Sequence, residues 1–281
     1  MNNDNKTDKD DATLPRLPEQ AGLPINRCNL PAQILGGLSF QRHPVALHID
    51  GVGILHTQLF QQLDGIGETT ERARRFMDYM VVQFRLHRLE DAGLMADERR
   101  GKADYLSLLR GWLFNPDGRE AAVLKAWVES RFGLLPRYHQ GPLQDHEGHH
   151  YQAYLTARSE GLYATNALEA QLDLLYSYCQ YELARVYRVD EHLRLYRGVN
   201  RIGELEVLEC LDKNRAILLL NNLNAFSLSR ERAEEFGDTI MQVDVPWQKC
   251  LFYSRLLPEH HIGEEEYLLI GGLYEISSRY W

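Results

Sequence analysis

The period of the hydrophobic pattern changes near residue 190, and this change constrains the fold more than any other feature of the chain. Before it, apolar residues recur every three or four positions, which is the spacing of one buried helix face. After it, apolar residues alternate with other residues, as in Leu193, Leu195 and Val199, which is typical of a strand. Helices come first and strands later, without regular βαβ alternation. The pattern therefore predicts an α+β fold, in which an N-terminal helical region packs on a C-terminal mixed or antiparallel β core.

The mainly helical region is expected over residues 29–190. Its clearest helix is predicted over about residues 166–188, where one apolar stripe contains Leu168, Leu172, Leu175, Cys179, Leu183 and Val186. Further helices are predicted over residues 69–89, 104–114 and 119–132, and the last two are separated by the turn-forming residues Asn115, Pro116, Asp117 and Gly118. A continuous apolar stripe must pack against another part of the protein.

The β-rich core is expected over residues 191–281. The alternating or apolar stretches that predict its strands are residues 193–199, 216–229, 239–245, 247–255 and 264–278. Between the second and third of these, residues 230–236 predict a short helix that ends at Gly237.

Residues 1–28 are expected to form a flexible tail, because a polar, charged start is followed by Pro15, Pro18 and Pro24 without an apolar period. The polar start does not resemble a secretory signal, and no apolar run is long enough to cross a bilayer. Four widely spaced cysteines, without a C-x-x-C pair, fit a reducing cytoplasm. A formal net charge of −9 argues against nucleic acid or an anionic membrane as a partner.

One candidate metal site is the H-E-x-x-H sequence from His146 to His150. In zinc peptidases, two histidines one helical turn apart bind the metal and the glutamate activates water. Gly148 lies inside this motif, and the local sequence is rich in histidine, which makes an accidental match easier. Glu169 is the best-spaced third ligand. We expect the start of a surface helix or a loop here, with no metal, and keep a zinc peptidase as an alternative.

Three consecutive carboxylates, Glu264, Glu265 and Glu266, lead directly into an apolar stretch. If the chain is extended there, Glu264 and Glu266 face the same side as Leu268 and Ile270, while Glu265 faces solvent on the other side. A carboxylate on the core-facing side of a strand is costly unless something pairs with it. A solvated turn is the alternative interpretation of the triplet.

Other polar residues occupy core-facing positions in the same part of the chain. Arg197 has the parity of Leu193 and Leu195, and a guanidinium in such a position favours a bidentate anion, either a phosphate or a structural carboxylate. Ser227 and Ser229 share parity just before the predicted short helix. An inward arginine, two inward serines and two inward glutamates on successive strands form a combination that chance rarely supplies.

These residues carry a resemblance to a known family. The ordered segments LYRG from Leu195, FSLS from Phe226 and the E-x-E of Glu264 to Glu266 resemble the arginine, serine, glutamate class of mono-ADP-ribosyltransferases, with Leu228 where a threonine is common. The helical part is similar to the dinitrogenase reductase ADP-ribosyltransferases in its segments ADYLSLLRGWLF (103–114) and AWVESRFGL (126–134). The resemblance covers residues 29–281.

The resemblance implies that NAD is a consumed co-substrate, cleaved at its nicotinamide glycosidic bond. It implies catalytic roles for Glu266, Glu264 and Ser229, and NAD contacts from Arg197, Gly198, Ser227 and Ser229. Glu266 would stabilise the developing ribose cation, and Glu264 would position an acceptor arginine and relieve it of a proton. The loop of residues 258–263 would meet the target.

The resemblance further implies that the acceptor is an arginine of dinitrogenase reductase, the iron protein of nitrogenase, and that its modification reversibly inactivates nitrogen fixation. It also implies a PII signalling protein as a possible regulator. Besides the zinc peptidase, one other alternative is a non-catalytic protein that binds NAD as a sensor.

Overall fold

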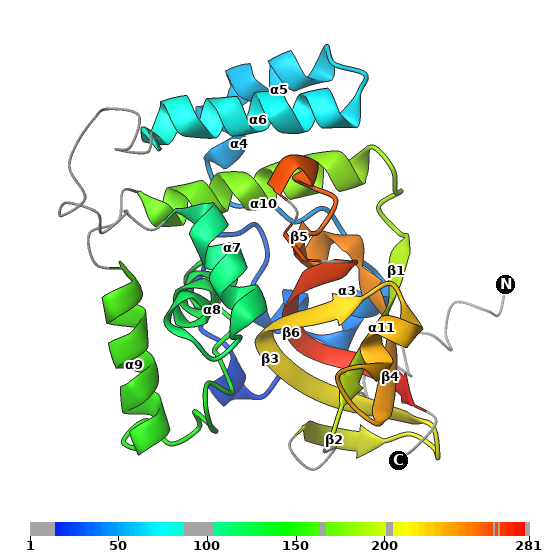
Figure 1. Cartoon of the computed structure of the whole chain (residues 1–281). Coiled ribbons are helices and arrows are strands. Elements are labelled where there is room, and N and C mark those ends of the chain that lie inside the picture. The colour runs from blue at the N-terminus through cyan, green and yellow to red at the C-terminus, as the bar shows by residue number, and fades with distance from the viewer. Residues whose placement is uncertain are drawn as a thin grey trace, which may run out of the picture.

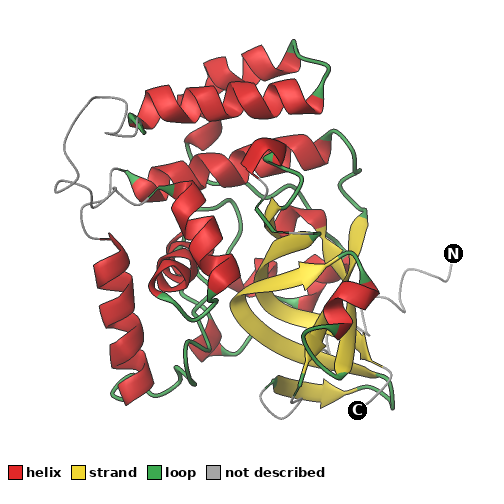
Figure 2. Ribbon diagram, viewed as in Figure 1, coloured by secondary structure: helices red, strands yellow, loops and turns green. Residues whose placement is uncertain are grey.

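The computed structural model describes residues 15–86, 104–162, 167–200, 205–260, 262–263 and 265–278. Helices gather in the N-terminal part and an antiparallel sheet in the C-terminal part, which confirms the predicted α+β class (Figure 2). The helices are α2 (Ala32–Leu35), α3 (Leu38–Arg42), α4 (Val52–Leu55), α5 (Thr57–Asp64), α6 (Thr69–Phe84), α7 (Tyr105–Phe114), α8 (Arg119–Phe132), α9 (His149–Leu162), α10 (Leu168–Ala184) and α11 (Arg230–Glu234), with 3-10 turns at Glu19–Ala21, Trp247–Lys249 and Pro258–His260.

Helix α10 is the predicted helix with the unbroken stripe, and it lies between the α5–α6 pair and the sheet (Figure 1). Its long apolar face is buried, and two bidentate ion pairs fix the polar sides. Arg72 of α6 binds Glu182 with Nε···Oε1 and Nη2···Oε2 distances of 2.7 Å. Arg131 of α8 binds Asp173 at 2.7 and 3.0 Å. Both pairs are buried, so each charge depends on its partner to offset the loss of hydration.

The strands are β1 (His192–Val199), β2 (Glu206–Cys210), β3 (Arg215–Ser227), β4 (Thr239–Pro246), β5 (Cys250–Tyr253) and β6 (Glu266–Ser278). Their order is β2-β3-β1-β4-β6-β5, and β3 also pairs with β6. Strands β3, β1, β4 and β6 therefore close into a ring. Two of the strand pairings in this ring are short. Strand β1 pairs with β3 at Tyr196 and Ser227, and β4 pairs with β6 at Met241 with Ser278 and at Gln242 with Ser277.

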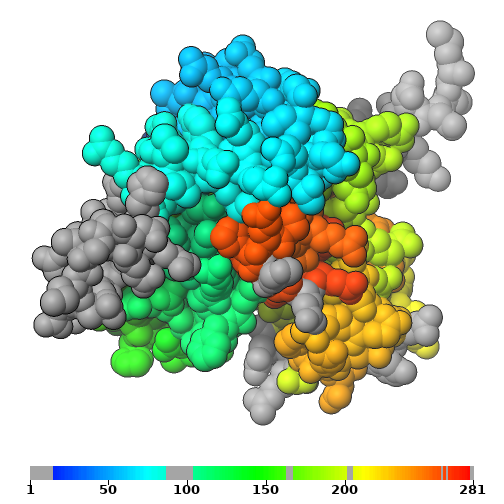
Figure 3. All heavy atoms as spheres, turned by 45° about the horizontal axis from the view of Figure 1, so that its top comes forward, coloured from blue at the N-terminus to red at the C-terminus, as the bar shows by residue number. Residues whose placement is uncertain are grey.

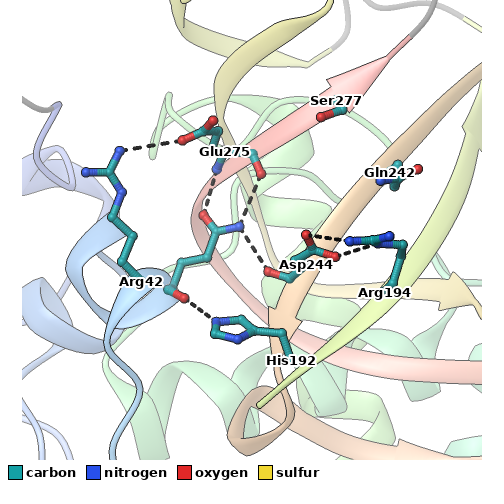
Figure 4. Close-up of a pocket in the computed structure, with 8 residues that line it drawn as sticks. Arg42, His192, Arg194, Gln242, Asp244, Glu275 and Ser277 are labelled. Carbon is teal, nitrogen blue, oxygen red and sulfur yellow. Dashed lines mark hydrogen bonds and ion pairs between the residues drawn. The ribbon is translucent and has the colours of Figure 1, made fainter. Parts of the chain in front are cut away.

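A segment of the helical region fills the gap between β4 and β6. The Leu273 amide donates to the Gly36 carbonyl at 2.7 Å. The Gln41 side chain donates from Nε2 to the carbonyls of Asp244 and Glu275, each at 3.1 Å, and its Oε1 accepts from the Glu275 amide at 2.8 Å (Figure 4). Backbone groups on an unpaired strand edge need partners. Gln41 supplies them, so the helical region is part of the sheet's hydrogen bonding.

The close approach of this segment depends on Gly272. Its φ of +107° is left-handed, and a Cβ there would lie 2.7 Å from the Gly36 Cα and carbonyl oxygen. Any other side chain would push the α2–α3 segment away from β6.

Lys249 is buried in the core, and no carboxylate of the described residues forms an ion pair with it. Its exposed fraction is 0%, its ammonium donates to the Gly271 carbonyl at 2.9 Å, and it lies 4.4 Å from the centre of the Tyr274 ring. Burial lowers the pKa of Lys249 from 10.5 to about 7. The cation–π contact and one hydrogen bond therefore do not offset the lost hydration.

The lowered pKa of Lys249 predicts a pH effect on stability. Between about pH 7 and 10.5 the unfolded chain binds a proton on Lys249 that the folded chain does not, so this residue makes stability rise with pH. Lys249→Met removes the effect. We expect the variant to be more stable than the wild type at pH 6.5, and the difference to shrink by up to about 1.4 kcal/mol per pH unit between pH 7.5 and 9.5. Urea unfolding of both proteins across this range measures it. A pH-independent difference would contradict the assignment.

The structure corrects part of the prediction that residues 1–28 form a flexible tail, because residues 15–28 pack on the rest of the protein. Leu17 and Ala21 are buried, and the Leu23 amide donates to the Gly133 carbonyl at 2.7 Å. The prolines exclude a regular helix, but isolated apolar residues between them still pack on the core. Residues 1–14 lie outside the described part of the chain.

The other predicted elements are confirmed with changed ends. Helix α6 ends at Phe84, and strand β5 begins at Cys250 after a 3-10 turn, whereas helix was expected to residue 89 and strand from residue 247. Leu89 lies outside the described residues. Strand β2, helices α2 to α5 and most of α9 were not predicted. Among the described helices, none has the length and apolarity that a bilayer crossing requires.

Candidate functional site

The three motif segments lie on adjacent strands. Tyr196 of β1 pairs with Ser227 of β3, and Ser227 in turn pairs with Glu266 of β6. Tyr196, which precedes Arg197, therefore lies in one row across three strands with Ser227 and Glu266. The structure thus brings together segments that are separated by about 30 to 70 residues in the sequence.

Arg197 is partly buried, and both hydrogen-bond acceptors of its guanidinium are neutral. Nη1 donates to the Asn224 side-chain oxygen at 3.4 Å and to the Ala225 carbonyl at 3.5 Å, and the guanidinium carbon lies 5.9 Å from the Phe226 ring centre. Burial lowers the pKa of Arg197, and Asp117 opposes the shift. Within the described residues no carboxylate forms an ion pair with it. No hydrogen-bond acceptor in the described part of the chain contacts its Nε or Nη2 group.

This environment differs from that of the buried Arg72 and Arg131 and of the partly buried Arg137. Arg72 and Arg131 each hold a buried carboxylate, and Arg137 binds Glu206 at 2.9 Å. Burying a guanidinium without a counter-ion costs free energy, unless an anion from outside the protein binds to it and offsets the lost hydration. Arg197 therefore has the properties of an anion-binding residue, and its Nε–Nη2 edge suits a bidentate phosphate or carboxylate.

Gly198 lets helix α11 lie against β1. A Cβ on Gly198 would lie 2.1 Å from the Ala233 carbonyl oxygen, which no side chain could tolerate. Gly198, which was predicted to contact NAD, thus allows α11 to pack closely against β1. This packing also brings the turn at Ser229, where α11 begins, close to β1.

The two motif serines build the turn from β3 into α11. The Ser227 hydroxyl accepts from the Ser229 amide at 3.1 Å. Ser229 is the N-cap of α11: its hydroxyl accepts from the Arg232 amide at 3.1 Å and donates to Glu231 at 3.0 Å. Such caps satisfy free amides at a helix start. Neither hydroxyl has a recorded hydrogen bond to Glu266.

Glu266 lies where the helical region meets the β core. It is partly buried, and the narrow cavity of about 10 Å³ beside it is otherwise lined by apolar residues: Leu109, Trp112, Leu113, Phe252, Ile262 and Leu268. Burial raises the pKa of Glu266, and Arg232 opposes the shift. Helix α7 thus contributes part of the wall around this carboxylate, which strengthens its interaction with any nearby positive charge.

Comparison with known proteins assigns the chain to a family. Residues 25–278 match the family model described as dinitrogenase reductase ADP-ribosyltransferase. The chain belongs to this family. A curated relative from Rhodospirillum rubrum, named NAD(+)--dinitrogen-reductase ADP-D-ribosyltransferase, is 37% identical over 267 residues, which are 92% of this chain and 96% of the relative. No solved structure matches the chain.

The acidic triplet of this family member differs from the prediction at its start. Strand β6 begins at Glu266, not at Glu264, because Glu265 has a left-handed φ of +55° that ends the alternation of faces. Glu265 is exposed, as predicted. Glu264 lies outside the described residues, so its predicted position beside Glu266 stays a prediction.

The H-E-x-x-H sequence does not form the helical metal site that it suggests. Helix α9 begins at His149, so His146 precedes the helix and is not one turn before His150 on it. His146 stacks on Tyr151 at 4.7 Å between ring centres, and Glu169 forms an ion pair with Arg131 at 3.1 Å. Among the described residues, no group of three or more potential ligands could hold a metal ion.

The predicted target-facing loop lies on the surface. The segment that includes Pro258–His260 is exposed between α6 and the α11 region (orange-red in Figure 3). Arg74 of α6 binds Glu259 at 3.2 Å, and Arg110 of α7 lies 3.4 Å from the His260 ring nitrogen. Side chains of α6 and α7 therefore contact this loop. His261 lies outside the described residues.

A cavity of about 590 Å³ lies at the other end of strands β1 and β6, away from their motif residues (Figure 4). Its lining residues come from α3 and from the parts of β1, β4 and β6 that lie near the Gln41 side chain: Gln41, Arg42, His192, Arg194, Gln242, Asp244, Glu275 and Ser277. Its charged groups are already paired, for example Arg194 with Asp244 at 2.9 Å. None of the predicted site residues lines it.

Proposed function

We propose that this protein is an NAD-dependent mono-ADP-ribosyltransferase that modifies an arginine of dinitrogenase reductase and thereby reversibly inactivates nitrogen fixation. Family membership and the name of the relative support the activity and the substrate. The structural observation that carries the proposal is Arg197, a partly buried guanidinium that forms no ion pair with any described residue. It follows Tyr196, which lies in the strand row that contains Ser227 and Glu266.

Arg197 is proposed to bind the NAD pyrophosphate. Its Nη1 contacts protein oxygens, which leaves the Nε–Nη2 edge for two phosphate oxygens. An anion there would replace the hydration that burial removes. Binding the pyrophosphate also holds the attached ribose near one position, so cleavage becomes a step within a preformed complex.

Glu266 is proposed to stabilise the positive charge that develops on the ribose as nicotinamide leaves. Its apolar surroundings make the carboxylate a stronger electrostatic partner than it would be in water. The same burial raises its pKa, so the active carboxylate form is lost as the pH falls through that raised pKa.

The remaining residues are proposed to act around this pair. Ser227, the register partner of Glu266 on β3, is proposed to orient the carboxylate, and Ser229 is proposed to support the same turn as the N-cap of α11. Gly198 lets α11 approach the NAD side of β1. Glu264 is proposed to receive the acceptor arginine and its proton. The cytoplasmic location and regulation by a PII signalling protein belong to the same proposal and are supported by the family resemblance alone.

Incubation with NAD labelled in its adenylate part tests the proposal. We expect free nicotinamide and label on an arginine of dinitrogenase reductase, and little label when lysine replaces that arginine. Nicotinamide release without labelled protein would overturn the acceptor assignment. Absence of both, with folded protein and active dinitrogenase reductase, would overturn the proposed enzyme.

A further inference from the structure

Strand β3 contains an asparagine-rich irregularity at its centre. Its pairing with β6 shifts register between Leu220 and Leu223, so Asn221 and Asn222 form a bulge within an otherwise apolar strand. Asn222 and Asn224 are almost completely buried, with exposed fractions of 1% and 4%. Buried amides are costly without hydrogen bonds, so their partners indicate what they hold.

Asn222 fastens the bulge to the helical region. Its Nδ2 donates to the carbonyls of Lys125 at 2.8 Å and Leu134 at 3.0 Å. Neither acceptor belongs to the proposed NAD site. Asn222 has no recorded contact with Arg197, so its described bonds are structural.

Asn221 connects the same region to Asn224. Its side-chain oxygen accepts from the Arg137 amide at 2.9 Å, and its Nδ2 donates to the Tyr138 carbonyl, also at 2.9 Å. Its own backbone carbonyl accepts from Asn224 Nδ2 at 2.6 Å. The short bond from Asn224 determines which way that amide points, because only its nitrogen can donate.

The fixed amide presents its oxygen to Arg197. Asn224 Oδ1 accepts from Arg197 Nη1 at 3.4 Å, and the neighbouring Ala225 carbonyl accepts from the same nitrogen at 3.5 Å. Both acceptors lie on the Nη1 side and both are neutral. The guanidinium is therefore oriented without being neutralised, and its opposite edge stays available for an anion.

We propose that Asn224 is a positioning residue for Arg197: held by its hydrogen bond to the Asn221 carbonyl, it turns the Nε–Nη2 edge of the guanidinium toward the pyrophosphate of NAD. The inference rests on the proposed function. A carboxylate at this position would orient the arginine equally well but would also neutralise it, which explains why a neutral amide serves better than an acid.

Three variants of the full chain test this role: Asn224→Ala, Asn224→Asp and, as the matched control, Asn222→Ala. Thermal unfolding first establishes a temperature at which all are folded. Nicotinamide release then gives KM for NAD and kcat separately. We expect Asn224→Ala to raise KM about tenfold with a smaller change in kcat. Asn224→Asp should raise KM at least as much, because its charge competes with the pyrophosphate for Arg197.

The Asn222→Ala control distinguishes a loss of Arg197 positioning from a general loss of protein stability. Asn222→Ala should lower the unfolding temperature but leave KM for NAD within about twofold of the wild type. An unchanged KM in Asn224→Ala, full rescue by Asn224→Asp, or an equal rise in Asn222→Ala would overturn the inference while leaving the proposed function intact.

A wild-type protein that neither binds nor cleaves NAD would instead overturn the proposed function. In that case inorganic pyrophosphate is the probe. We expect it to raise the unfolding temperature of the wild type and of Asn222→Ala but not of Asn224→Ala. No stabilisation of the wild type, or equal stabilisation of all three proteins, would overturn the inference.

Discussion

Replacing Glu266 with glutamine is expected to lower the rate of nicotinamide release by about 10²–10³-fold, with the protein still folded. Glutamine keeps the size of the side chain and can still accept a hydrogen bond, but it has no negative charge for the ribose cation. Because the loss concerns the transition state, kcat should fall while KM for NAD changes little. Steady-state release of nicotinamide, with circular dichroism to verify folding, measures both.

The adjacent Glu265→Gln variant is the matched control. Glu265 is exposed and precedes β6, so removing its charge should leave nicotinamide release near the wild-type rate. If Glu265→Gln caused the larger loss, the roles of the acidic residues would be misassigned by one position. A folded Glu266→Gln protein with wild-type activity would exclude Glu266 as the catalytic carboxylate.

Replacing Arg197 with lysine is expected to raise KM for NAD by about tenfold to a hundredfold. Lysine keeps the positive charge but cannot offer two parallel N–H groups to the pyrophosphate, and it loses the orientation that Asn224 and Ala225 provide. The effect on kcat should be smaller, because Glu266 is unchanged. Initial rates over a range of NAD concentrations separate the two constants.

Arg194→Lys is the matched control on the same strand. Arg194 is exposed and forms an ion pair with Asp244 at 2.9 Å, and exposed pairs contribute little to stability. Its replacement should change neither KM nor kcat measurably. Equal effects of the two substitutions would point to a general effect of charge on β1, and an unchanged KM in Arg197→Lys would remove the pyrophosphate assignment.

Much of the fold could be predicted because its longest elements have strong periods. The apolar stripe of α10 and the alternation in β1 are patterns of local residue spacing, which can be read from the sequence without knowing the tertiary contacts. Arg197 could be singled out for the same reason, since one charged residue interrupts an otherwise apolar face. The lack of a counter-ion for Arg197 among the described residues could not be foreseen, because it depends on where the carboxylates lie in the folded chain.

The remaining features depend on contacts between distant segments. Helices α2 and α3 have four and five residues, too few to show a period, and Gln41 has meaning only beside β4 and β6. Helix α9 buries mainly Tyr154 and Gly161, which leaves no apolar stripe to detect. For Asn224 a signal did exist: three asparagines interrupt an apolar strand, which requires buried partners for their amides.

The hydrogen bonds between Gln41 and Glu275 join residues 234 positions apart. During synthesis, the N-terminal segment therefore leaves the ribosome long before its partner strand exists. Strand β6, which carries Glu266, is the last strand of the ring to emerge, so the ring cannot close before β6 has been synthesised. A ribosome-bound chain lacking β6 would thus have neither the proposed catalytic glutamate nor a closed sheet, so we expect that it could not consume NAD. Such long-range pairing also predicts slow folding relative to helical proteins of similar size.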